Sequence, residues 1–157
     1  MIEQYNGDIF DSPAEIIVHS CNCFCTMGAG IAKEIKKRYA RAYDVDCMTK
    51  KGDRTKLGQF SFALSNKDQK QTVINLYSQY LFGRGKQFVD YDAFFHALEN
   101  FREWLIKMQY NNQIVGIPYG ISCNNAGGNW EKIYSIIKYV FGAKDEKIRV
   151  LICKNEK

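Results

Sequence analysis

The sequence is poor in proline, has little histidine and contains no long apolar run. Its two prolines, Pro13 and Pro118, leave most of the 157 residues free to form uninterrupted helices and strands. The longest apolar stretches are far too short to cross a bilayer. Residues 1–5 have no basic region followed by an apolar run, so we expect no signal peptide. These absences predict a cytoplasmic protein whose six cysteines are mostly thiols rather than a disulfide framework.

The composition is that of a folded domain. Hydrophobic residues make up 46% of the chain and charged residues 25%, unlike a disordered sequence. Ten phenylalanines, ten tyrosines and two tryptophans provide the apolar area for a core. The length fits one domain, which we expect to span residues 1–157.

The basic residues are concentrated in one segment. Residues 33–56 contain nine lysines and arginines against four acidic residues, which accounts for the whole net charge of +5. Such a segment would attract nucleic acid or an anionic substrate. The alternative is the solvated face of one helix and its loop.

Apolar periodicity predicts alternating strands and helices. Short apolar runs indicate strands, and alternation at 60–64 indicates another with one covered face. Repeats at intervals of three and four indicate helices, most clearly from Phe94 to Met108. The expected strands are 16–18, 60–64, 73–77, 114–117 and 148–153, and the helical positions are Ile31, Ile35, Tyr39 and Ala42; Phe94, Leu98, Phe101, Leu105 and Met108; and Trp130, Ile133, Ile137 and Val140.

This order predicts an α/β fold with helices on both faces of a largely parallel sheet. In such sheets, ligands bind beyond the carboxyl ends of the strands. Two glycine-containing loops, 19–31 and 119–130, each leave a strand and enter a helix. Glycine lets the backbone approach a ligand, and a helix N-terminus offers unpaired N–H groups to phosphate. Together the loops predict a site that holds a diphosphate from both sides.

Four motifs in order resemble the macrodomain family, over nearly the whole chain. They are Gly7-Asp8-Ile9, 18–22 (VHSCN), 27–32 (MGAGIA), and 118–120 (PYG) through 126–130 (AGGNW). The similarity is to the branch of yeast-type ADP-ribose-1″-phosphate phosphatases, related phage and bacterial proteins, and terminal ADP-ribose-protein glycohydrolases. It implies a three-layer α/β/α sandwich around a mixed, largely parallel sheet, with ADP-ribose in a cleft over the strand ends.

The resemblance also implies binding roles. Asp8 would accept a hydrogen bond from the adenine amino group, the Ile9 backbone would meet the ring, and Asn22 would bind the distal ribose. Two loop segments would enclose the distal ribose and the diphosphate: Met27, Gly28, Ala29, Gly30 and Ile31; and Ser122, Cys123, Asn124, Asn125 and Ala126. Structural alternatives exist, because Asp8 would also cap a turn and Asn22 would also satisfy backbone groups in its own loop.

His19 is the catalytic candidate, because the phosphatase relatives carry a histidine at the matching place. A histidine can act as general acid, general base or nucleophile on a terminal phosphate. Its alternative is a strand-end histidine with a structural hydrogen bond. The groups that the glycohydrolases use are absent: their loop aspartate aligns with Ala126 and their lysine falls near Gln79. Asn129 replaces an acid that relatives carry beside the tryptophan, which disfavours catalysis.

Two further features concern the cysteines of the first loop and a basic loop. The run Cys21-x-Cys23-x-Cys25 lacks the spacing and the second pair of a zinc site, so we expect no metal. The basic loop around Arg84 and Lys86 is either a contact to phosphate or an exposed connection.

The leading hypothesis is a hydrolase acting on ADP-ribose-1″-phosphate. The alternatives are a non-catalytic module that binds ADP-ribose or a related nucleotide, and nucleic-acid binding through residues 33–56. We expect no cofactor and no membrane partner. The expected partner is ADP-ribose or a derivative, free or attached to a macromolecule.

Overall fold

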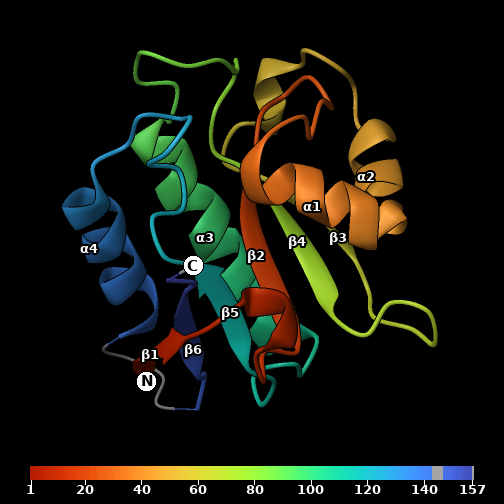
Figure 1. The fold of residues 1–157 in the computed structure, drawn as a ribbon, viewed down its shortest axis with the longest axis vertical. Coiled ribbons are helices and arrows are strands. Elements are labelled where there is room, and N and C mark those ends of the chain that lie inside the picture. The colour runs from red at the N-terminus through yellow and green to blue at the C-terminus, as the bar shows by residue number, and fades with distance from the viewer. Residues whose placement is uncertain (143–146, 157) are drawn as a thin grey trace.

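Helices cover both faces of a single mixed sheet in the computed structural model, which describes residues 1–142 and 147–156 (Figure 1). The three-layer α/β/α arrangement expected from the sequence is confirmed. The strands are β1 (Ile2–Asn6), β2 (Ile16–Cys21), β3 (Phe60–Ala63), β4 (Thr72–Tyr77), β5 (Val115–Pro118) and β6 (Val150–Lys154). The helices are α1 (Gly30–Arg38), α2 (Ala40–Cys47), α3 (Tyr91–Lys107) and α4 (Trp130–Phe141), with short 3-10 turns η1 (Ile9–Asp11) and η2 (Arg54–Lys56).

The strand order creates a place for a ligand. The order is β1-β6-β5-β2-β4-β3, with every neighbouring pair parallel except β3 and β4. From β2 the chain continues to β3 and β4 on one side of the sheet, and from β5 it continues to β6 on the other. Strands β2 and β5 are paired only at Ile16 and Ile17, near their amino ends. Ligands of open α/β sheets bind at such a switch point, beyond the carboxyl ends of the strands.

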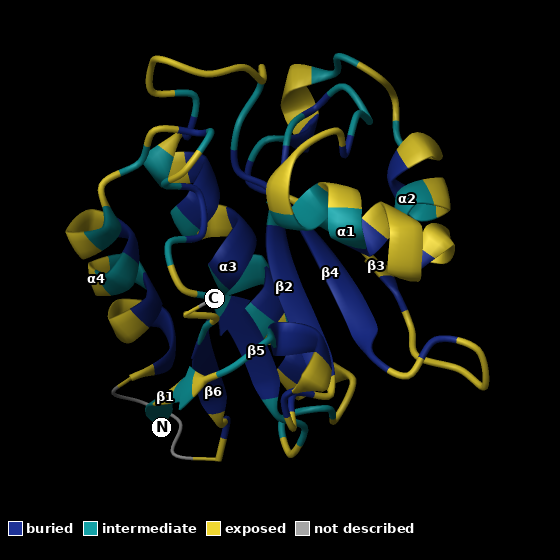
Figure 2. Cartoon of the chain, viewed as in Figure 1, coloured by how far each residue is buried: buried dark blue, intermediate teal, exposed yellow. Residues whose placement is uncertain are grey.

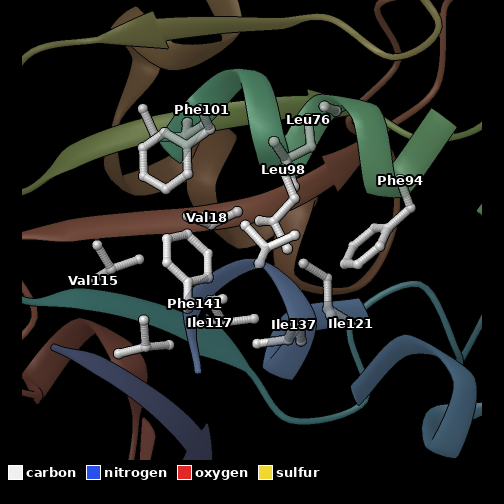
Figure 3. Close-up of a cluster of buried hydrophobic side chains, with 14 of the residues drawn as sticks. Val18, Leu76, Phe94, Leu98, Phe101, Val115, Ile117, Ile121, Ile137 and Phe141 are labelled. Carbon is white, nitrogen blue, oxygen red and sulfur yellow. The ribbon is translucent and has the colours of Figure 1, made fainter. Parts of the chain in front are cut away.

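The two central strands are buried along both faces, as expected for a covered parallel sheet (Figure 2). Alternate side chains of one strand point to opposite faces. On the face covered by α3 and α4, residues such as Val18 and Leu76 join a large apolar core with Phe94, Leu98 and Phe101 (Figure 3). The face covered by α1 and α2 has a smaller apolar cluster.

One expectation about local structure is corrected, and one strand was not predicted. The helical stripe from Ile31 to Ala42 forms two helices, because Tyr39 leaves helical geometry at φ −128° and ψ 72°. The buried Tyr39 hydroxyl donates to Gln71 Oε1 at 2.7 Å, which fixes the chain at this break. Strand β1 was not predicted, because its half-exposed residues at the sheet edge show no continuous apolar run.

Helix α3, the longest helix of the described residues, is amphipathic and has a charged outer face. Among the residues that the structure describes, no helix combines the length and apolarity that a bilayer crossing requires.

Candidate functional site

A cleft of about 410 Å³ lies at the carboxyl edge of the sheet, between the ends of β2 and β5. The two glycine loops form opposite walls, and residues after β4 close a third side (Figure 1, where these segments lie at the top). The volume falls in the range of small-molecule sites. The lining residues are Ser20, Cys21, Asn22, Thr26–Ala32, Asp46, Gln79, Phe82, Gly83, Arg84 and Pro118–Ala126. The predicted residues Asn22, Met27–Ile31 and Ser122–Ala126 therefore meet in one cleft.

Asn22 lines the cleft and also holds its own loop. Its side-chain Oδ1 accepts from Phe24 N at 2.7 Å, and its Nδ2 donates to Thr26 Oγ1 at 2.7 Å. The structural role that the sequence allowed is thus present. It leaves one amide proton and one acceptor lone pair for a ligand, because an amide offers two of each.

The first loop brings the N-terminus of α1 to the cleft. Met27, at φ 39°, takes a left-handed conformation that is uncommon without glycine, and it is buried under the loop. The helix begins at Gly30, and its N-cap residue Ala29 provides no side-chain hydrogen bond. Gly30, Ile31 and Ala32 line the cleft, so the uncapped first turn lies beside the space for a ligand. Helix N-termini of this kind attract anions.

The second loop is fixed from two sides. Ser122, also left-handed at φ 64°, forms a hydroxyl–hydroxyl hydrogen bond with Ser20, which joins the loop to β2. The Ala126 carbonyl accepts from Phe88 N at 2.7 Å and from Val89 N at 3.1 Å. Non-glycine residues held in left-handed conformations are enriched at functional sites.

Gly127 makes this close approach possible. A Cβ at this position would collide with the carbonyl oxygen of Lys86, and its φ of +70° also favours glycine. The segment after β4 therefore packs directly on the second loop. It contributes Arg84 to the cleft, the only lysine or arginine in the lining formed by the described residues, whereas Lys86 lies over the Phe88 ring.

His19 does not line the cleft, contrary to the expectation for a catalyst. It is fully buried, and its Nε2 lies 2.6 Å from Asn75 Oδ1. The Asn75 amide nitrogen donates to Ala42 O and Ser61 Oγ, so its oxygen is the acceptor and His19 Nε2 carries the proton. Burial lowers the pKa of His19 to about 4, although the bond to Asn75 opposes this shift. The residue is a neutral structural group at neutral pH.

The two residues expected at adenine also lie outside the lining. Asp8 caps η1, where its Oδ1 accepts from Phe10 N at 3.0 Å. Ile9 is buried in the apolar cluster beneath α1. The capping role is therefore present for Asp8, while the roles toward adenine remain predictions.

Asp46 is a cleft residue that the sequence analysis missed. This carboxylate of α2 is 1% exposed and lines the cleft. Burial raises the pKa of Asp46, against the hydrogen bond from Tyr77 and the charge of Lys56, which both lower it. A signal existed in the sequence, because Asp46 continues the apolar stripe of Ile35, Tyr39 and Ala42 at helical spacing.

A chain of hydrogen bonds connects Asp46 to His19 inside the sheet. Asp46 Oδ1 accepts from the Tyr77 hydroxyl at 2.8 Å, and this hydroxyl lies 2.9 Å from Ser61 Oγ. Ser61 Oγ accepts from Asn75 Nδ2 at 3.0 Å, and Asn75 accepts from His19. The network therefore fixes the Asp46 carboxyl through its Oδ1 atom.

The cysteines of the first loop are free thiols. Cys21 lines the cleft, with its sulfur 3.5 Å from His19 Nε2. Burial raises the pKa of Cys21 well above its usual value, so the nucleophilic thiolate is disfavoured. Across residues 1–142 and 147–156, no three histidine, cysteine or acidic side chains gather into a metal-binding group.

Asn129 lies at the start of α4. Its Oδ1 accepts from Lys132 N at 3.2 Å and caps α4, and its backbone N–H donates to the Tyr91 hydroxyl. Asn129 is not part of the cleft lining, whereas its neighbour in the loop, Ala126, is.

Comparison with curated proteins finds full-length and partial relatives. An uncharacterized 17.5 kDa protein of Enterobacteria phage T4, from the tk-vs intergenic region, is 32% identical over 161 residues, covering 97% of this chain and 96% of that protein. An ADP-ribose 1″-phosphate phosphatase of Aspergillus oryzae is 42% identical over 45 residues, which cover 28% of this chain and 22% of the enzyme. No family model matches the chain.

Solved structures share the fold along the whole chain. The macrodomain of Mycobacterium tuberculosis DarG aligns with a TM-score of 0.76 at 18% identity, over 100% of this chain and 99% of that one. Thermosipho africanus DarTG in complex with ADP-ribose aligns with a TM-score of 0.70 at 15% identity, over 96% of this chain and 40% of that one. Fold and cleft define a three-layer α/β protein with a ligand-sized site at the switch point of its sheet. The chain has the macrodomain fold and is related along its whole length to the uncharacterized phage T4 protein.

Proposed function

We propose that the cleft binds ADP-ribose or a derivative and that the protein hydrolyses ADP-ribose-1″-phosphate. The observation that carries the proposal is the uncapped first turn of α1 facing the second glycine loop across one cleft. Backbone N–H groups at a helix N-terminus suit a diphosphate. The partial similarity to a phosphatase and the ADP-ribose complex of a structural neighbour support the same ligand class.

The arrangement of the diphosphate and the distal ribose follows from the lining, and that of the adenine follows from the family resemblance. The diphosphate would lie between Gly28–Ile31 and Ser122–Ala126. The distal ribose would lie beside Asn22 and Met27, and the adenine would extend toward Asp8 and Ile9. Arg84 would supply positive charge to the phosphates from the third side of the cleft.

A matched pair of variants tests the site. Ala29 lines the cleft, whereas Ala40 is an exposed residue at the start of α2 outside it. We expect calorimetry to show ADP-ribose binding by the wild type and by Ala40→Trp. Ala29→Trp should weaken binding by at least about tenfold, which is 1.4 kcal/mol, because the indole occupies ligand space. Equal affinities of the two variants would contradict binding in this cleft.

Phosphate release from ADP-ribose-1″-phosphate tests the catalytic part. The wild type is expected to release inorganic phosphate in a time-dependent manner. Binding without release would support the second candidate, a non-catalytic ADP-ribose module. The burial of His19 and the absence of acids at Ala126 and Asn129 favour that candidate.

Nucleic-acid binding is a further candidate because eight of the nine basic residues of the 33–56 segment are exposed; the exception, Lys56, donates to Thr49 Oγ1 and is buried. Binding of a labelled RNA or DNA oligonucleotide through this segment would fall steeply with salt concentration. ADP-ribose affinity that changes little over the same salt series would favour the cleft.

A further inference from the structure

The cleft contains one carboxylate within the described part of the chain, Asp46. It lies at the end of the cleft that includes Cys21 and Met27. Met27, Cys21 and Tyr77 form one buried cluster, and the Tyr77 hydroxyl donates to Asp46. Under the proposed function, this end of the cleft holds the distal ribose and the phosphate attached to it.

The carboxyl of Asp46 is held at one oxygen and open at the other. Oδ1 accepts from Tyr77, and the backbone carbonyl accepts from Thr49 Oγ1 at 2.6 Å and from Cys25 Sγ at 3.2 Å. In residues 1–142 and 147–156, no hydrogen bond reaches Oδ2. A carboxylate oxygen without a protein partner, on a residue that lines a cleft, is suited to bind a water molecule or a ligand hydroxyl.

Nearby groups keep this carboxylate usable as a base. Lys56 Nζ, fixed on Thr49 Oγ1 at 2.9 Å, provides a positive charge that stabilises the ionised carboxylate. Burial acts in the opposite direction and raises the pKa of Asp46 from its ordinary value. A carboxylate shifted upward in this way is a better proton acceptor near neutral pH than an exposed one.

We propose that Asp46 is the catalytic acid–base residue of the cleft, taking the role that the sequence suggested for His19. The proposal rests on the proposed function, since it requires a phosphate on the distal ribose. Oδ2 accepts a proton from a water molecule as the water oxygen bonds to phosphorus. The bond between phosphorus and O1″ breaks, with its electron pair remaining on O1″, and Asp46 then delivers the proton to that oxygen. The products are ADP-ribose and inorganic phosphate, and Asp46 returns to its ionised form.

Asp46→Asn is the direct test, because the amide keeps the shape of the side chain and its oxygen can still accept from Tyr77. We expect kcat for phosphate release to fall by at least about 100-fold, with the calorimetric Kd for ADP-ribose changed by less than about threefold. The matched control is Asp44→Asn, an exposed carboxylate on the same helix, which should keep the wild-type kcat. Unchanged kcat in Asp46→Asn, or a loss of ADP-ribose binding as large as the loss of kcat, would overturn the assignment.

The pH profile of the wild type provides a second readout that needs no variant. We expect kcat to fall at acid pH as one carboxyl with a raised pKa takes up a proton, and this limb should disappear from the residual activity of Asp46→Asn. A kcat that stays constant through the acid range would overturn the assignment even if the variant failed to fold. The titratable groups that interact with Asp46 are Tyr43 on α2, Tyr77 on β4, Lys56 on η2, Cys21 on β2, and Cys23 and Cys25 in the first loop.

Failure of the proposed function gives different results from failure of the Asp46 assignment. A wild type that binds no ADP-ribose would refute the ligand, and one that binds it but releases no phosphate would refute the hydrolase and the role of Asp46 together. If the wild type releases phosphate and Asp46→Asn releases it equally fast, the role of Asp46 alone is refuted.

Discussion

The two faces of the central strands differ in chemistry although both are buried. On β2 and β4, Ile16, Val18, Ile74 and Leu76 face α3 and α4 and join an entirely apolar core. The opposite face of the same strands carries His19, Asn75 and Tyr77 among its buried residues. His19 and Asn75 are hydrogen-bonded to each other, and Ser61 of β3 connects Asn75 to Tyr77.

The comparison separates the source of stability from the source of chemistry. Burial of apolar side chains stabilises the fold by about 1.5–3 kcal/mol per large residue, without directionality. A buried polar network contributes little net stability, but it fixes orientation and shifts pKa values. Asp46, the only acidic residue in the cleft lining formed by the described residues, belongs to the polar face.

The largest effect is expected on the apolar face. Phe101 is fully buried and packs against Phe60 and Phe141. Phe101→Ala should lower the free energy of unfolding by about 3–5 kcal/mol, because it removes apolar burial and leaves a cavity. Urea denaturation measures this change. The ADP-ribose affinity of the folded variant should stay at the wild-type value, and a change of more than about tenfold, 1.4 kcal/mol, would show that the faces are coupled.

A pH-dependent effect is expected on the polar face. The pKa of His19 is about 4 in the folded protein, below its unfolded value of 6.5, so the unfolded chain binds the proton more readily. His19 therefore contributes no pH dependence above pH 6.5, and stability is lost as the pH falls through 6.5 toward 4. The loss amounts to about 3 kcal/mol.

His19→Gln provides the comparison, because its amide can still donate to Asn75 but does not titrate in this range. The free energy of unfolding, measured by urea denaturation at pH 7 and pH 4, should fall by about 3 kcal/mol more in the wild type than in the variant. Parallel pH curves would mean that His19 is not held neutral by burial.

A smaller effect is expected within the network. Ser61→Ala removes the hydroxyl that connects Tyr77 to Asn75. It should cost about 1–2 kcal/mol of unfolding free energy, because an Asn75 amide proton loses its partner in a buried setting. Thermal denaturation followed by circular dichroism measures the cost. A neutral result would show that water replaces the hydroxyl.

The smallest effect is expected at the start of α4, away from both faces. Asn129→Ala removes the N-cap hydrogen bond to Lys132 and should cost about 1 kcal/mol. Asn129→Asp should keep the cap, and its negative charge at a helix N-terminus should add a few tenths of a kcal/mol. The same denaturation series distinguishes the two. Equal stability of Asn129→Ala and the wild type would contradict the cap.

Periodicity in the sequence predicted the fold well and the polar face poorly. Helix α3 and strands β2, β4 and β6 follow from their apolar repeats, because the apolar positions in the sequence are the positions that the fold buries. The interruption between helices α1 and α2 at Tyr39 depends on a long-range hydrogen bond to Gln71, which no local pattern encodes. The position of His19 next to a glycine loop predicted a cleft residue. Its side chain is instead buried in a hydrogen bond to Asn75 on a different strand, which the local sequence does not encode. Residues 33–56 were interpreted by their positive charge, so the carboxylate of Asp46 within this segment was not predicted as a site residue.

The central claim is that ADP-ribose binds in the cleft between the two glycine loops. Backbone amide chemical shifts of the isotope-labelled protein, recorded during titration with ADP-ribose, test it most directly. We predict saturable shifts concentrated at residues 22–32 and 119–126, together with Arg84 on the third wall. An unchanged spectrum, or shifts confined to the exposed basic residues of 33–56, would contradict the claim.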